Sequence, residues 1–99
     1  MRPIHLVRLD KPRPAVILTR ELARPFMSRQ TIAPITSTIK GLTTEVRVDE
    51  RNGLDHESVI SCDGLMTVSV AQIGKQIGVL HDDQEEELSF AVRRALDLR

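Results

Sequence analysis

The chain has 99 residues, which is enough for one domain with a modest core and too few for two. Its composition, 40% hydrophobic and 28% charged residues, is typical of a globular protein and excludes an intrinsically disordered chain. No apolar stretch approaches the roughly 20 residues of a membrane span. A single cysteine excludes an internal disulfide framework, and no signal peptide opens the chain, so we expect a cytoplasmic protein with no membrane partner.

The formal net charge is zero, but the charges are unevenly distributed along the chain. Residues 1–47 carry a net charge of +6, and residues 48–99 carry −6. This pattern fits either two solvated faces or a cationic surface for a polyanion. Phe26 and Phe90 are the only aromatic residues. A nucleic-acid binder of this composition would therefore contact phosphates and base edges instead of stacking bases.

Short runs of branched or alternating apolar residues predict strands along most of the chain. In chain order they cover residues 4–9, 15–19, 31–37, 43–48, 58–62, 65–70 and 76–80. The run 15–19 is continuous enough to be buried on both faces. Pro12 and Pro14 exclude a helix before it, and Pro34 indicates an edge position or a bulge. Turns are predicted at Asn52-Gly53 and Asp63-Gly64, and a single helical turn over 70–75.

The chain ends in an amphipathic helix, predicted over about 83–96. Five apolar residues with helical spacing form one stripe: Leu88, Ala91, Val92, Ala95 and Leu96. Asp82 or Asp83 is the expected N-cap, and acidic residues in the first turn and arginines in the last turn suit the helix dipole. Short strands followed by one helix predict a mainly β fold, a small twisted barrel with helical cover. The barrel is expected over about 1–81 of a single domain, 1–99.

Several kinds of site are excluded by residue spacing. His5, His56, His81 and Cys62 lie far apart without metal-ligand spacing, so no metal site is predicted. We interpret each histidine as an ordinary surface or half-buried residue, and Cys62 as a small buried hydrophobe. The chain also has no glycine-rich phosphate loop and no nucleophile elbow.

Two short stretches together suggest a phosphate site. In KPRP, Arg13 stands between two prolines, which restrict the backbone and help to aim its guanidinium at a phosphate. In TSTIKG, the hydroxyls of Thr36, Ser37 and Thr38 are potential donors to phosphate oxygens, and Lys40 adds a second cation. Each stretch alone is an ordinary turn or strand end. In combination they predict a site for phosphate without a metal or a thiolate.

A resemblance to a known family covers about residues 4–98. The blocks that carry it, in order, are RPAVILT, APITSTIKGLTTEVRV and GLDHESVISCDGLMTVSVAQIGKQIGVL, followed by the final helix. They resemble the MazF/PemK family of toxin endoribonucleases, and most of all its short, mycobacterial-type members. The resemblance implies an SH3-like barrel of the CcdB/PemK type without a cofactor. It also implies a homodimer with RNA-binding grooves at the dimer face, inhibited by a partly disordered MazE-type antitoxin.

The resemblance further implies an activity and the residues that perform it. A toxin of a type II toxin–antitoxin system would cut single-stranded RNA at short sequence motifs without a metal, as an endoribonuclease of the mRNA interferase type that inhibits translation and growth. The arginine of the family's R-P motif corresponds to Arg13 and the first threonine of its P-x-T motif to Thr36, and both are catalytic in the family. RNA contacts are implied for Lys11, Ser37, Thr38, Lys40 and Asp63.

The implied reaction uses the nucleophile that RNA itself carries. The ribose 2′-OH attacks the adjacent phosphate, which leaves a 2′,3′-cyclic phosphate and a 5′-OH, so DNA should bind but survive. The guanidinium of Arg13 is expected to stabilise charge on the phosphorane, because a pKa above about 12 suits it poorly to proton transfer. Thr36 is expected to donate a hydrogen bond to the phosphate.

Two departures from the family pattern and two alternative functions accompany this hypothesis. The opening segment MRPIHLVRLDKP shortens the loop that usually folds over the active site, and Gly64 stands where several relatives have a substrate-contacting side chain. Both departures concern cleavage specificity.

A CcdB-type toxin that binds gyrase without cutting anything shares the barrel, but this chain lacks the tryptophan that such toxins carry near the C-terminus. A purely structural barrel module is the other alternative.

Overall fold

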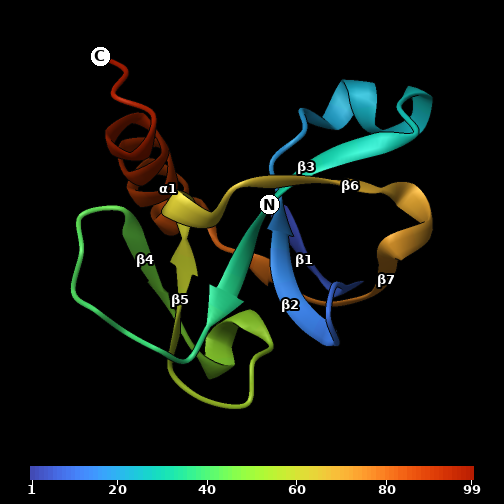
Figure 1. Cartoon of the computed structure of the whole chain (residues 1–99). Helices are drawn as coiled ribbons and strands as arrows, with labels where there is room; N and C mark the ends of the chain where they lie inside the picture. The colour runs from blue at the N-terminus through green and yellow to red at the C-terminus, as the bar shows by residue number, and fades with distance from the viewer.

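The computed structural model describes all residues, 1–99, and places seven strands before one α-helix (Figure 1). The strands are β1 (Arg2–Arg8), β2 (Pro12–Ile17), β3 (Arg29–Thr36), β4 (Glu45–Val48), β5 (Ser58–Ser61), β6 (Met66–Ser69) and β7 (Ile73–Leu80). The α-helix is α1 (Asp82–Ala95), and four short 3-10 helices are η1 (Glu21–Phe26), η2 (Glu50–Asn52), η3 (Cys62–Gly64) and η4 (Val70–Gln72). None of the helices is long and apolar enough to cross a membrane.

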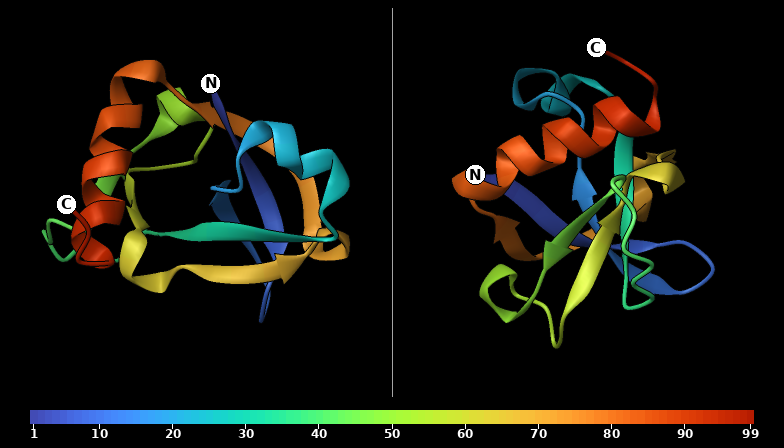
Figure 2. Two further views of the ribbon diagram at one scale, coloured as in Figure 1. Left: turned by 90° about the horizontal axis from the view of Figure 1, so that it is seen from above. Right: turned by 90° about the vertical axis from the view of Figure 1, so that its left-hand side faces the viewer.

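The strands form one antiparallel sheet in the order β4-β5-β3-β2-β1-β7. The long strand β3 joins its two parts: residues 29–32 pair with β6, and residues 35–36 pair with β5. Register shifts between β1 and β7 increase the bend, as bulges do. The sheet curls into a half-barrel with α1 at one side (Figure 2). The predicted mainly β, barrel-like fold is therefore confirmed, although the end strands β4 and β7 do not pair to close it.

The core consists of two adjoining apolar clusters. The larger lies between the sheet and α1 and includes Ile4, Val16, Ile35, Val46, Ile60, Leu80 and Leu88. The smaller, inside the curl, comprises Val7, Ala15, Ile17, Ile32 and Val68. Residues 15–17 of β2 thus point alternately into the two clusters, which explains why this part of the strand is continuously apolar and buried on both faces, as the sequence predicted. Burial of each large aliphatic side chain contributes about 1.5–3 kcal/mol.

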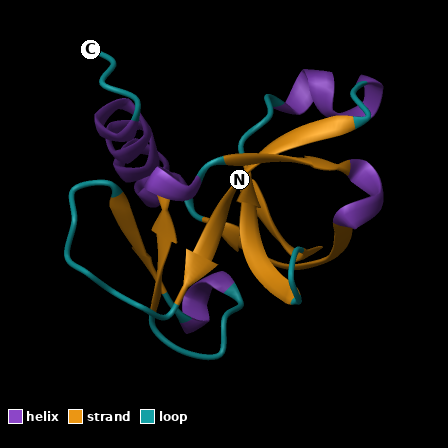
Figure 3. Ribbon diagram, in the orientation of Figure 1, coloured by secondary structure: helices purple, strands orange, loops and turns teal.

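The helix α1 follows the last strand, β7 (Figure 3). Its apolar pattern is as predicted in the middle, but its two ends differ from the prediction. The N-cap residue is His81 and not Asp82 or Asp83, because the side chain of Gln84 reaches back to accept a hydrogen bond from the His81 N–H. Leu88 and Ala91 are buried as expected. Leu96, placed in the apolar stripe by its spacing, lies beyond the last helical turn and is exposed.

The segment between β2 and β3 forms η1, which the sequence did not indicate. None of its residues is buried, and Leu22 and Phe26 expose 86% and 88% of their surface. The helical turn predicted over 70–75 is shorter, since η4 ends at Gln72 and β7 begins at once.

Candidate active site

A groove of about 460 Å³ opens where the turn between β1 and β2 meets the end of β3. Three segments line it: residues 11–14, residues 35–37, and the loop from Gly53 to Ser58, with Leu6 and Ile77 at its base. The first two segments contain the KPRP and TSTIKG stretches. The structure therefore brings together the two stretches that the sequence singled out.

Strand pairing explains why Arg13 and Thr36 share this groove. Strands β2 and β3 are antiparallel, with Ala15 opposite Pro34. Continuing that register by two residues places Arg13 opposite Thr36, at the point where the two strands diverge. Both residues line the groove, and neither points into the apolar interior.

The guanidinium of Arg13 is held by a carboxylate that the sequence interpretation missed. Its Nε and Nη2 donate to the two carboxylate oxygens of Asp10 at 2.8 and 2.9 Å, a bidentate pair across the tight turn. This hydrogen bonding holds the pKa of Asp10 well below its usual range and raises the pKa of Arg13. Nη1 makes no hydrogen bond within the chain and stays available for a phosphate. The spacing Asp-x-x-Arg around a proline turn was the available signal.

Thr36 ends β3 with its hydroxyl oxygen fixed. The Thr36 Oγ1 accepts a hydrogen bond of 3.1 Å from the Thr38 N–H, a local turn that leaves the hydroxyl proton free to be donated. Ser37 follows on the same groove and is exposed. Lys11, on the opposite wall, adds an exposed ammonium group. One guanidinium, one ammonium and two hydroxyls thus converge on a space that suits an anionic, phosphate-bearing ligand.

Three other residues implied by the family resemblance lie outside the groove. Thr38 turns away after donating its N–H, and Lys40 belongs to the long loop that leads from β3 to β4 (Figure 1). Glu45 anchors that loop by accepting hydrogen bonds from the N–H groups of residues 40–42. Asp63 lies in η3 and accepts a hydrogen bond of 2.7 Å from the Thr44 hydroxyl.

The sequence interpretation assigned only a turn to the loop that forms the third wall. Gly53 adopts φ +88°, and a Cβ at this position would overlap the Ile77 carbonyl oxygen. This close approach seats the loop against β7 and turns Leu54, Asp55 and His56 toward the groove. The contact joins residues distant in sequence, so the residue pattern of the loop did not indicate it.

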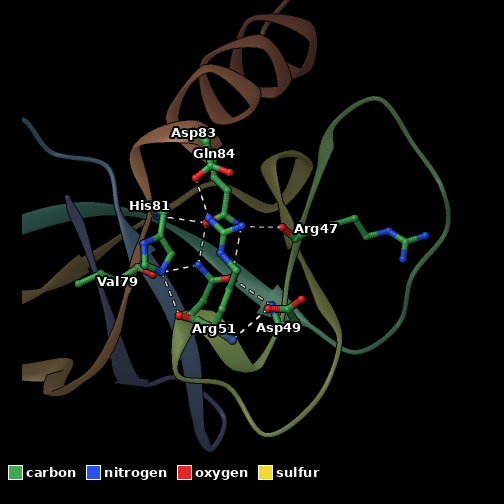
Figure 4. Close-up of polar contacts among 8 residues, drawn as sticks. Arg47, Asp49, Arg51, Val79, His81, Asp83 and Gln84 are labelled. Atoms are coloured by element: carbon green, nitrogen blue, oxygen red, sulfur yellow. Dashed lines mark hydrogen bonds and ion pairs between the residues drawn. The ribbon is translucent and has the colours of Figure 1, made fainter.

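A buried amide network holds the start of this loop. Asn52 is fully buried, and its Nδ2 donates to the Val79 carbonyl at 2.9 Å and to Gln84 Oε1 at 2.7 Å. Gln84 Nε2 in turn donates to the Arg47 carbonyl at 3.2 Å and to Asn52 Oδ1 at 3.3 Å. Figure 4 shows the contacts of Gln84 at the start of α1 with His81 and with Arg47 of β4. The network joins β4, η2, β7 and α1.

The three histidines differ in their environments. The His5 Nδ1 lies 2.8 Å from the Gly74 carbonyl, and the His81 Nε2 lies 3.0 Å from the Arg51 carbonyl. The ring of His56 is exposed, makes no hydrogen bond within the chain, and lines the groove. Nowhere do three or more His, Cys, Asp or Glu side chains gather in the manner of metal ligands.

Cys62 is not placed for nucleophilic chemistry. The residue is 1% exposed and packs in the larger core cluster, as the sequence predicted. Burial, with a smaller contribution from the neighbouring Asp63, raises the pKa of its thiol to about 11. The thiolate is the reactive form, so this side chain is inert near neutral pH.

A second hollow, of about 470 Å³, lies between the first strands and α1. Two of its three charged side chains are already paired with each other, because Arg2 Nε donates to Glu85 Oε1 at 3.0 Å, and Arg2 Nη1 also donates to the Ile17 and Leu18 carbonyls. The groove at Arg13 is therefore the better candidate for anion chemistry.

Comparisons with known proteins agree with this assignment. The family described as PemK-like, MazF-like toxin of type II toxin-antitoxin system matches residues 6–96. The endoribonuclease MazF3 of Mycobacterium tuberculosis is 53% identical over 98 residues, which cover 99% of this chain and 95% of that protein. The probable endoribonuclease MazF5 of the same organism is 34% identical over 86 residues, or 86% and 79% of the two chains.

Solved structures give the same result. The Mycobacterium tuberculosis toxin MazF-mt6 superposes with a TM-score of 0.97 at 52% identity over 99% of both chains. A MazE–MazF crystal structure from Deinococcus radiodurans shares the fold, with a TM-score of 0.82 over 98% of this chain and 93% of that one, at only 18% identity. The chain therefore belongs to the PemK-like, MazF-like toxins of type II toxin–antitoxin systems and is a MazF-type endoribonuclease.

Proposed function

We propose that the chain cuts single-stranded RNA at specific short sequences, without a metal ion, by attack of a ribose 2′-OH on the adjacent phosphate. The products are a 2′,3′-cyclic phosphate and a 5′-OH, and cleavage stops translation and growth. The observation that supports this chemistry most directly is the shared groove, in which the Arg13 guanidinium and the Thr36 hydroxyl face one space beside Lys11.

In this mechanism each residue acts on the scissile phosphate. Arg13 uses the N–H groups that Asp10 leaves free to neutralise charge on the phosphorane, and Asp10 positions the guanidinium before RNA binds. Thr36 donates its hydroxyl proton to a phosphate oxygen, while Lys11 and Ser37 contact the backbone on either side. The attacking group belongs to the substrate, so DNA binds in the same groove without being cut.

The test compares variants on a short RNA whose products are identified by mass spectrometry. Arg13→Ala and Thr36→Ala should each lower the cleavage rate by about 10²–10³-fold, the usual loss for one preorganised donor. Arg29→Ala and Thr67→Ala, which remove an exposed arginine and an exposed threonine elsewhere on the sheet, are the matched controls. Thermal unfolding should not distinguish the four variants. Products that end in a 3′-OH and a 5′-phosphate would contradict the proposed reaction.

We further propose that a cognate MazE-type antitoxin inhibits this chain and that the active form is a homodimer. Toxins of this fold from Deinococcus radiodurans and from a mycobacterial species have been crystallised with their antitoxins. The exposed apolar side chains of Leu22 and Phe26 on η1 support burial against a second chain. Light scattering at micromolar concentration should give twice the mass of 11.1 kDa, and a monomer mass would contradict the homodimer.

A further inference from the structure

The groove contains a histidine with no assigned role. Of the three histidines, only His56 lines the space shared by Arg13 and Thr36, and only its ring lacks a hydrogen bond within the chain. A free, exposed imidazole in a groove built for phosphate is available to a substrate. Its backbone is nevertheless fixed, because the Ser58 hydroxyl donates to the His56 carbonyl at 3.3 Å and Gly53 is seated against β7.

The proposed cleavage needs a proton donor that the groove's other residues do not supply. The P–O5′ bond breaks readily only if the departing 5′-oxygen gains a proton. Arginine holds its proton too firmly, with a pKa above about 12, and lysine ordinarily titrates near about 10.4. Carboxyl groups ordinarily lose their proton near about pH 4. Imidazole side chains ordinarily titrate near about 6.5, which suits proton transfer at neutral pH.

We propose that His56 is the general acid of the cleavage reaction, an inference that rests on the proposed 2′-OH mechanism. As the O2′–P bond forms and the P–O5′ bond breaks, the His56 imidazolium passes a ring proton to the 5′-oxygen. The proton of the 2′-OH passes to water, and the neutral imidazole regains a proton from water after product release. Arg13 stabilises the phosphorane throughout, so the two functions fall on separate residues.

Few charged side chains around His56 lack a partner within the chain. Asp55 beside it has no partner in the chain, whereas the neighbouring Glu57 pairs with Arg47. Across the groove, the charge of Arg13 is balanced by Asp10, which leaves Lys11 as the one unpaired cation. The scissile phosphate adds negative charge on binding. The groove therefore presents a free carboxylate, a free ammonium group and a free imidazole to a bound substrate.

The experiment measures single-turnover cleavage by His56→Gln over a range of pH. The rate should fall by about 10²–10⁴-fold, the contribution typical of acid–base catalysis, and the wild-type decline at alkaline pH should disappear. Binding of an RNA with a 2′-deoxy substitution at the cleavage site should not change. His5→Gln is the matched control, because its ring contacts Gly74 away from the groove, and its rate should equal that of the wild type.

A substrate with sulfur in place of the bridging 5′-oxygen separates acid catalysis from mere binding. A thiolate leaves without being protonated, so His56→Gln should cleave this substrate nearly as fast as the wild type does. The proposal would be overturned if His56→Gln lost the same factor in cleavage rate on the oxygen and sulfur substrates, or if it cleaved the oxygen substrate at the wild-type rate. It would also be overturned if the wild-type cleavage rate declined only at acidic pH. If the wild type forms no 2′,3′-cyclic phosphate, the proposed function itself fails. Cyclic products formed at full rate by His56→Gln would refute only the role of His56.

Discussion

Replacement of Asn52 by alanine tests whether the buried amide network holds the third wall of the groove. The side chain is fully buried and makes four hydrogen bonds, including one of 3.1 Å that its Oδ1 accepts from the Asp49 N–H. In Asn52→Ala, Gln84 keeps its bonds to the His81 N–H and the Arg47 carbonyl, whereas the Asp49 N–H and the Val79 carbonyl lose this partner.

The expected cost follows from those lost bonds. A fully buried polar group left without a partner costs about 1–3 kcal/mol, or about 2–6 kcal/mol for two. The Asp49 N–H and the Val79 carbonyl are only partly buried, so we expect the lower part of that range, a loss of about 3 kcal/mol in the free energy of unfolding. For a domain of this size, that loss corresponds to a decrease of roughly 10–25 °C in Tm.

Thermal unfolding followed by circular dichroism, at one protein concentration, measures this decrease. The control is Gln76→Ala, which removes an exposed side-chain amide bonded only to the Gly78 carbonyl and should change stability by less than about 0.5 kcal/mol. If Asn52→Ala unfolds within a few degrees of the control, the network does not carry the stability that its geometry implies, and the reasoning is refuted.

Three further predictions remain, two on the turn that holds Arg13 and one on a left-handed glycine. Since pairing with Arg13 lowers the pKa of Asp10, the stabilisation from this pair should persist throughout the neutral range and vanish only in acid, as the pH falls through the lowered pKa. An NMR titration of the Asp10 carboxyl carbon measures this pKa, and a midpoint near the ordinary value of about 4 would contradict the pairing. Asp10→Ala should slow RNA cleavage about threefold to tenfold, because the guanidinium of Arg13 must then be ordered when RNA binds. In the Arg13→Ala background the same substitution should have no further effect, which a double-mutant cycle measures. Gly53→Ala should destabilise the fold by several kcal/mol more than Gly41→Ala in urea unfolding, because both positions have positive φ but only the first lacks room for a Cβ; equal losses would refute the steric argument.

Most of the residues proposed to contact the phosphate could be predicted from local sequence patterns. The prolines around Arg13 and the hydroxyl run that begins at Thr36 are local patterns, and they predicted two walls of one groove. The continuous apolar run of β2 likewise predicted a strand buried on both faces. These inferences succeeded because each depends on neighbours within a few residues, where backbone restriction and side-chain alternation act directly.

Other features depend on contacts that a residue pattern does not fix. The stretch TSTIKG offered Lys40 as a second cation beside the hydroxyls, and in the structure Glu45 holds the loop that carries Lys40 outside the groove. Helical spacing alone placed Leu96 in the apolar stripe, but the helix ends before it. The histidines were treated as equivalent, and only the fold separates His56 on the groove from the two rings that bond to carbonyls elsewhere.

The amino-acid sequence by itself determined the family, the mainly β architecture and the pairing of an arginine with a threonine as candidate catalytic groups. The pairing of Asp10 with Arg13 is a local contact whose spacing the sequence already contained, whereas tertiary structure alone decided that His56 stands in the groove. The physical reason is the range of the contacts. Asp10 and Arg13 are three residues apart, whereas the loop of His56 is positioned by Asn52 and Gly53 against β7, which lies more than 20 residues further along the chain.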